Sequence, residues 1–117
     1  MGTSFVEYKQ HGFWSRDSYI ATWIDAMITE LEALKDNQSW LIPLVENWRI
    51  QAKIDGGCMR LDLDTFVVDE SCRKLLIRAA QSANARCDTH ARRTGELFIS
   101  LISGQLKTTV SSPIDYL

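Results

Sequence analysis

The chain has few of the residues that build metal or redox centres. Its 117 residues include two histidines, His11 and His90, and three cysteines, Cys58, Cys72 and Cys87. No CxxC pair, no zinc-type Cys/His spacing and no HExxH motif is present. Two of the cysteines lie fifteen residues apart on one expected helix, or about four turns, so they cannot share an ion there. We expect no metal and no cofactor.

Motifs for covalent and nucleotide chemistry are also missing. The sequence has no GxSxG, no phosphate loop and no GxGxxG. Its one glycine pair, Gly56-Gly57, is typical of a helix end. Cys87 and His90 stand three residues apart and are the remaining candidates for a nucleophile and its base. A helix end at which His90 interacts with the terminal carbonyls explains the spacing of Cys87 and His90 as well. We expect a protein that is not an enzyme.

Long apolar runs are absent. No stretch reaches the roughly 20 apolar residues that span a membrane. The first residues carry neither the basic start nor the apolar run of a signal peptide. With unpaired cysteines as well, a cytoplasmic protein is expected. Hydrophobic content of 45% and charged content of 24% favour one folded domain over residues 1–117.

Charge is divided unevenly along the chain. Residues 1–70 hold six Lys/Arg against twelve Asp/Glu, a net charge of −6. Residues 71–117 hold seven against three, a net charge of +4. The total of −2 hides this difference. One half of the chain therefore offers an acidic surface and the other a basic one.

Periodicity predicts an all-α domain. The clearest apolar stripe, from Ile20 to Leu34, recurs at the three-and-four spacing of a helix. Ser15 is its expected N-cap, Ser39 can cap the next helix, and Gly104 is expected to end the last one. We expect a single compact domain whose four main helices cover about 15–36, 39–53, 69–88 and 94–103, with a tail at 105–117.

Two segments fall outside these helices. The first dozen residues are expected to be extended, which allows a short β segment at the N-terminus. Residues 58–68 fit either a short strand or a loop held by apolar anchors. Gly12 is expected to break the chain before the first helix, and Pro43 to fit in the first turn of the second.

Acidic residues gather on the expected loops and helix starts. The spacing of Asp62 and Asp64 resembles part of a calcium loop, but the turn glycine and the closing glutamate are missing. Such carboxylates are either simply solvated or form a docking surface for a basic partner. The docking hypothesis selects Asp55, Asp62, Asp64, Asp69 and Glu70.

Four tryptophans are many for this length. Trp23 and Trp48 fall on predicted core stripes. Trp14 and Trp40 lie at helix starts, where they either pack against a neighbouring helix or serve as interface anchors, a role in which tryptophan is common.

A basic region offers an alternative to the acidic surface. It favours nucleic-acid binding, whereas the acidic pI near 5.6 opposes it. The same residues can instead pair with the acidic half of the chain, or with a second copy in a homo-oligomer. The region comprises Arg73, Lys74, Arg78, Arg86, Arg92 and Arg93.

The segment from Tyr8 to Trp23 resembles a family of small bacterial proteins that open with Gly-Phe-Trp-x-Arg-Asp. The likeness continues through a Trp-bearing helix, the pair Gly57-Cys58 and a last helix containing Glu96-Leu97-Phe98-Ile99. These are immunity proteins of polymorphic and contact-dependent toxin systems. The resemblance implies a cytoplasmic antitoxin whose partner is a cognate toxin domain, with basic nucleases among the toxins of this kind. An immunity protein needs a stable scaffold and a complementary surface, but no catalytic group.

Overall fold

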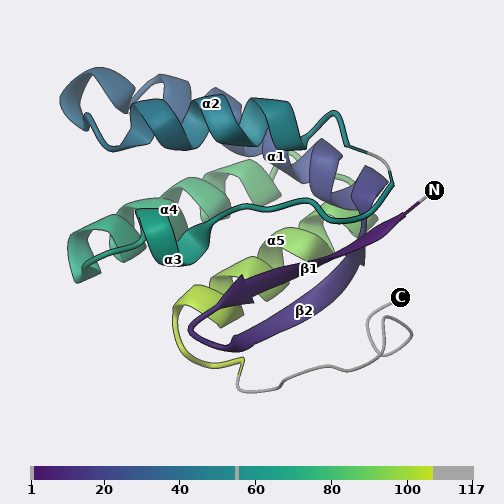
Figure 1. Cartoon of the computed structure of the whole chain (residues 1–117). Coiled ribbons are helices and arrows are strands. Elements are labelled where there is room, and N and C mark those ends of the chain that lie inside the picture. Colours follow the sequence, from purple (N-terminus) through teal and green to yellow (C-terminus); the bar gives the residue numbers. More distant parts are fainter. Residues whose placement is uncertain (1, 55, 107–117) are drawn as a thin grey trace.

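A β-hairpin precedes a set of packed helices in the computed structural model, which describes residues 2–54 and 56–106 (Figure 1). The protein is mostly helical, as predicted, but it is not purely all-α, because the short β segment that the sequence allowed at the N-terminus is one strand of a two-stranded antiparallel sheet. The elements are β1 (Thr3–Tyr8), β2 (His11–Arg16), α1 (Asp17–Glu32), the 3-10 turn η1 (Lys35–Asn37), α2 (Leu41–Gln51), α3 (Leu63–Phe66), α4 (Glu70–Asn84) and α5 (Thr89–Ile102).

The hairpin turn consists of Lys9 and Gln10, whose φ angles are 50° and 72°. Two successive positive φ angles make a type I′ turn, which matches the twist of paired strands. Gly12 was expected to break the chain before the first helix, but it lies inside β2. A side chain there would meet the carbonyl oxygen of Val6 at 2.2 Å, so this strand position requires glycine.

The first helix begins later than predicted. Ser15 is the last buried residue of β2 rather than a cap, and its hydroxyl lies 3.0 Å from that of Thr94. Helix α1 starts at Asp17 without a side-chain cap from Arg16 and ends at Glu32. The predicted stripe is confirmed up to Leu31, whereas Leu34 follows the helix and is 38% exposed.

The other helices also differ at their ends. Pro43 lies in the first turn of α2, as predicted, but Ser39 does not cap it, because Trp40 holds the N-cap position. Helix α2 ends at Gln51, before the glycine pair. Helix α4 ends at Asn84 and α5 already begins at Thr89, five residues before the predicted start.

The break between α4 and α5 has a clear local cause. The carboxylate of Asp88 accepts a hydrogen bond from the backbone N–H of Ala91 at 2.9 Å and so caps α5. Cys87 therefore lies in the connection rather than on α4, and its side chain is buried. The segment 58–68 holds one helical turn, α3, and no strand.

Helix α1 is central, since it packs against α2, α4 and α5. Three buried aromatic rings meet at this point. The ring centroid of Trp23 is 5.8 Å from that of Trp48 and 4.6 Å from that of Phe98. The two indole nitrogens donate to Asn84 Oδ1 and to the carbonyl oxygen of Leu61, so this core has both apolar packing and satisfied polar groups.

The C-terminal end of α5 confirms the predicted glycine stop. Gly104 has a φ of 83°, its N–H donates to the carbonyl of Leu101, and the N–H of Gln105 donates to that of Ser100. This pair of bonds is the Schellman motif, which favours glycine at the left-handed position.

Replacing Gly104 with alanine is expected to lower the free energy of unfolding by about 1 kcal/mol, because the added Cβ is disfavoured at this φ. No atom of the described residues lies within 4 Å of that Cβ, so the effect isolates backbone strain from crowding. Urea denaturation measures it. An unchanged midpoint would contradict the conformational argument.

Candidate interaction surface

The segment 58–62, which has no regular secondary structure and positive φ angles at Cys58 and Asp62, runs beside β1. The N–H of Met59 donates to Ser4 Oγ at 3.0 Å, and the N–H of Lys9 donates to Asp64 Oδ1, also at 3.0 Å. Both bonds join residues 55 positions apart, so the segment lies parallel to β1 and in register with it (Figure 1). Residues 59, 61 and 63 are buried while 58, 60 and 62 are exposed.

A buried carboxylate holds the start of this segment. Asp17 is 2% exposed, accepts a hydrogen bond from Ser4 Oγ at 2.5 Å, and accepts another from the N–H of Gly57 at 2.6 Å. The first residue of α1 thereby ties the loop to the hairpin.

A groove of about 650 Å³ lies between the hairpin and the loop, and we call it the acidic trough. Its wall on the hairpin side holds the rings of Phe5 and Trp14, whose centroids are 5.2 Å apart. Its lining contains three carboxylates and one cation, Arg60. The lining residues are Thr3, Ser4, Phe5, Glu7, Trp14 and 56–65.

Three of the residues selected from the sequence meet in the acidic trough. Asp62 and Asp64 are exposed on the loop side, and Trp14 is half-buried on the hairpin side. Asp55 falls outside the described residues. The trough thus gathers side chains that are about 50 positions apart in the sequence.

Asp69 and Glu70, which were also selected from the sequence, form contacts within helix α4 and do not line the acidic trough. The carboxylate of Asp69 caps the helix by accepting from the N–H of Cys72 at 2.9 Å, and this bond lowers the pKa of Asp69. Glu70 forms an ion pair with Arg73. The cap stabilises the fold above the ordinary carboxyl pKa, and its contribution is lost as the pH falls through the lowered value.

Trp40 also lies away from the acidic trough. It is half-buried at the N-cap position of α2, and its indole nitrogen donates to Gln38 Oε1 at 3.2 Å. Its position supports the packing alternative for this tryptophan.

Glu7 was missed in the sequence. It lines the acidic trough, is exposed, and is the third carboxylate there. The signal was present, because Thr3, Phe5 and Glu7 alternate with the buried residues Ser4, Val6 and Tyr8. A strand assignment of the first residues would have placed Glu7 on the outer face with Phe5.

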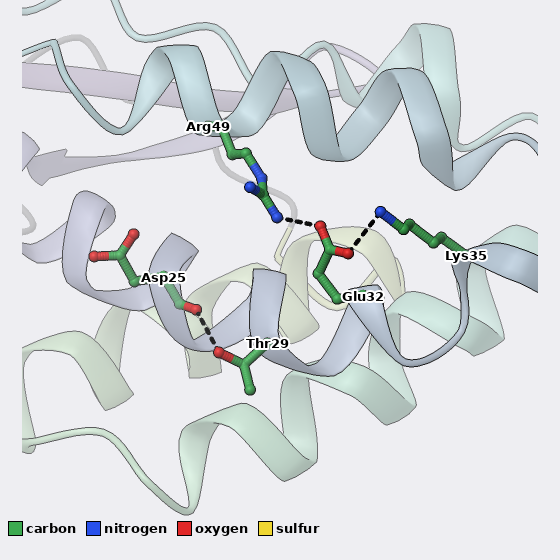
Figure 2. Close-up of polar contacts among 5 residues, drawn as sticks. All are labelled: Asp25, Thr29, Glu32, Lys35 and Arg49. Atoms are coloured by element: carbon green, nitrogen blue, oxygen red, sulfur yellow. Dashed lines mark hydrogen bonds and ion pairs between the residues drawn. The ribbon is translucent and has the colours of Figure 1, made fainter.

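Glu32, another acidic residue, stabilises the fold and does not line the acidic trough. Figure 2 shows Glu32 between Lys35 and Arg49, and the Lys35 Nζ lies 2.7 Å from Glu32 Oε2. These contacts, led by the hydrogen bond from Lys35, lower the pKa of Glu32. Glu32 thereby links the end of α1 to η1 and α2, whereas the hydroxyl of Thr29 donates back along α1 to the carbonyl of Asp25.

The basic residues do not form one surface. Arg86 pairs with Glu30 at 2.7 Å and Arg92 donates to the carbonyls of Asn84 and Cys87. Lys74 and Arg78 border a groove between α1 and α4, and Arg93 is exposed on α5. Intramolecular pairing accounts for part of the set.

The suggested cysteine–histidine pair has a different environment from the one that nucleophilic chemistry requires. Burial, followed by the charge of Asp88, raises the pKa of the Cys87 thiol. The ring of His90 stacks on Tyr19, with centroids 4.6 Å apart and planes within 4°. Over the described residues, no three His, Cys, Asp or Glu side chains converge as metal ligands.

None of the helices in the described ranges combines the length and apolar character needed to cross a membrane. The chain matches no protein family, no curated protein and no solved structure. The resemblance to immunity proteins therefore stays a prediction from its motifs.

Proposed function

We propose that this protein is an immunity protein that binds a cognate bacterial toxin and blocks its active site or its partner site. The observation that carries the proposal is the acidic trough, where Glu7, Asp62 and Asp64 surround the aromatic pair of Phe5 and Trp14. Aromatic side chains supply buried contact area at interfaces, and surrounding charges set orientation and encounter rate.

The chemistry of the trough favours a basic partner. Among the described residues of its lining, three carboxylates outnumber one cation, that of Arg60, which gives a net charge of −2. A nuclease toxin needs a positively charged cleft for its phosphate substrate. A carboxylate surface that enters such a cleft competes with the nucleic acid, which requires no catalytic step by the immunity protein.

The structure also supplies the rigidity that such a surface needs. Asp17 and Ser4 fix the start of the loop, and the bond from Lys9 to Asp64 fixes its end. Side chains held before binding lose less conformational entropy in the complex. The backbone that carries Asp62 and Asp64 is therefore held in place before the toxin binds.

The first test is protection. The C-terminal domain of the protein encoded next to this gene is expressed alone and with this protein, and we expect growth arrest in the first case and growth in the second. Purified together, the two proteins should form a stable complex. Continued growth arrest together with separate elution would contradict the proposal.

The surface is tested by a charge change within the trough. The double variant Asp62→Lys, Asp64→Asn adds three positive charge units while the Asn amide oxygen still accepts from Lys9. We expect the association rate at low salt to fall roughly tenfold or more, with a weaker salt dependence, because steering is reduced. Stopped-flow mixing at several ionic strengths measures both.

The matched control is Asp25→Lys, Asp36→Asn, which makes the same charge change at two exposed positions outside the trough. It should retain most of the association rate. If both double variants slow association equally, overall charge and not the trough controls encounter. If neither has an effect, the toxin binds another surface.

A further inference from the structure

Two buried nitrogen atoms have no hydrogen-bond partner in the part of the chain that the structure describes. They are His11 Nδ1 and Arg73 Nε. More than nine in ten buried polar groups in proteins have a partner, and an exception often marks the place of a water or an ion. The two unpartnered nitrogen atoms belong to residues that lie at the same place in the fold, which makes this exception informative.

Both residues line the same pocket of about 330 Å³, at the turn end of the hairpin. His11 lies directly opposite Tyr8 in the strand register, and the hydroxyl of Tyr8 accepts a hydrogen bond from Arg73 Nη2 at 3.3 Å. Tyr8 thus links the histidine on β2 to the arginine on α4. Lys9, in the turn, completes the polar side of the pocket.

The charges in this pocket favour an anion. Arg73 and Lys9 bring two cations to the lining. Two carboxylates lie next to these residues but not among the described residues of the lining: Glu70 pairs with Nη1 of Arg73 and not with Nε, and Asp64 accepts from the backbone N–H of Lys9. Helix α5 ends here, and its terminal carbonyls would oppose an anion. The carbonyls of Ile99, Ser100 and Leu101 are already bonded within the Schellman turn, which reduces that opposition.

The size of the pocket also bears on its occupant. A water molecule takes about 30 Å³ of liquid volume, so this space holds roughly ten waters. One bridging water would satisfy a nitrogen atom but would leave most of the pocket and both cations unused. An oxyanion with several acceptor oxygens can reach donors on both sides.

We propose that this pocket binds a small phosphate-type oxyanion, either the free ion or the phosphate group of a small phosphomonoester. Arg73 Nε–H and a His11 Nδ1–H donate to two of its oxygens, and the ammonium of Lys9 supplies the third contact. Guanidinium groups are well suited to phosphate oxygens in geometry and charge. Tyr8, 4% exposed, positions Arg73 and does not itself need to touch the ligand.

This site is separate from the acidic trough. Tyr8 points to the opposite face of β1 from Phe5 and Glu7, because successive strand residues alternate. Binding of the oxyanion therefore does not depend on the toxin proposal, and each can fail without the other.

The test is calorimetric titration of the full chain with inorganic phosphate and with adenosine monophosphate at constant ionic strength. We expect saturable binding of at least one of them with a stoichiometry of one. Binding of inorganic phosphate but not of adenosine monophosphate identifies the free ion as the ligand. Tighter binding of adenosine monophosphate identifies a phosphomonoester. Binding that does not saturate with either probe would overturn the proposal.

Two variants assign that binding to the pocket. Arg73→Lys keeps the positive charge but removes Nε, and His11→Asn shortens the second donor; each should weaken binding tenfold or more. Arg78→Lys makes the same chemical change further along α4, outside this pocket, and should bind as the original chain does. Equal affinity in all three would place the anion elsewhere and refute the assignment.

A direct measurement guards against variants that fail to fold. In the unaltered protein labelled with ¹⁵N, phosphate should shift the resonances of the Arg73 Nε–H and of the His11 ring. Shifts confined to other residues would refute the site even if no variant could be purified.

Discussion

Replacing Gly95 with alanine should lower the free energy of unfolding by about 3 kcal/mol or more. Gly95 is buried in α5, where a Cβ would come within 1.8 Å of Asn84 Oδ1 and 2.5 Å of Trp23 Nε1. No side-chain adjustment relieves contacts this short without moving both partners. Overpacking alone costs about 1–3 kcal/mol in well-packed cores.

The second part of the cost comes from a broken hydrogen bond. Trp23 Nε1 donates to Asn84 Oδ1 at 3.1 Å, and both side chains are buried. If the added methyl group separates them, each loses a partner without gaining water, which costs about 1–3 kcal/mol. The indole of Trp23 also contacts Phe98, so its displacement would disturb the aromatic core.

Urea denaturation monitored by tryptophan fluorescence measures this loss. The matched control is Gly56→Ala, because a Cβ at position 56 has no atom of residues 2–54 or 56–106 within 4 Å and no positive φ constrains it. We expect that control to stay close to the original stability. A Gly95→Ala variant as stable as the control would show that α4 and α5 can separate at little cost.

The sequence predicted best where one face of an element is apolar and the other polar. The stripe of α1 gave the correct helix and the buried Trp23, and Gly104 gave the correct stop. Helix ends were less accurate, because caps such as Asp88 compete with a continuing apolar pattern. A single carboxylate that bonds to a backbone N–H decided where α5 begins.

The sequence allowed a short β segment at the N-terminus but did not predict the second strand of the hairpin, because the alternation of both strands is hidden. The inner face of the hairpin includes the buried hydroxyl residues Ser4 and Ser15, and its outer face includes the half-buried rings of Phe5 and Trp14. Apolar and polar residues therefore occur on both faces, and the period of two is blurred. The hydroxyl groups of these two serines form hydrogen bonds with Asp17, Met59 and Thr94. These partners come close to the serines only in the folded chain.

The acidic trough could be predicted only in part for the same reason. The loop carboxylates Asp62 and Asp64 stand out as exposed acids in the sequence. Their register against β1 depends on contacts over 55 positions, which no local pattern encodes. Glu7 joins them solely through that register.

Replacing Asp17 with alanine should be the other severe change, with an expected loss of about 3–5 kcal/mol in the free energy of unfolding. The carboxylate is buried, and it accepts from Ser4 Oγ and from the N–H of Gly57. Removing it leaves both donors without this acceptor, and a hydrogen bond to a charged group contributes about 1.5–3 kcal/mol. The loop that forms one side of the trough would lose its anchor to α1.

Asp17→Asn separates the two parts of this effect. Asparagine keeps one acceptor oxygen but turns an amide donor toward either Ser4 or Gly57, so we expect an intermediate loss of about 1–2 kcal/mol. Asp25→Ala, at an exposed carboxylate on the same helix, is the control and should have little effect. Chemical denaturation of the three variants measures the order. If Asp17→Ala were as stable as Asp25→Ala, the bridge between hairpin, helix and loop would not hold the trough, and the rigid presentation of its carboxylates would need another source.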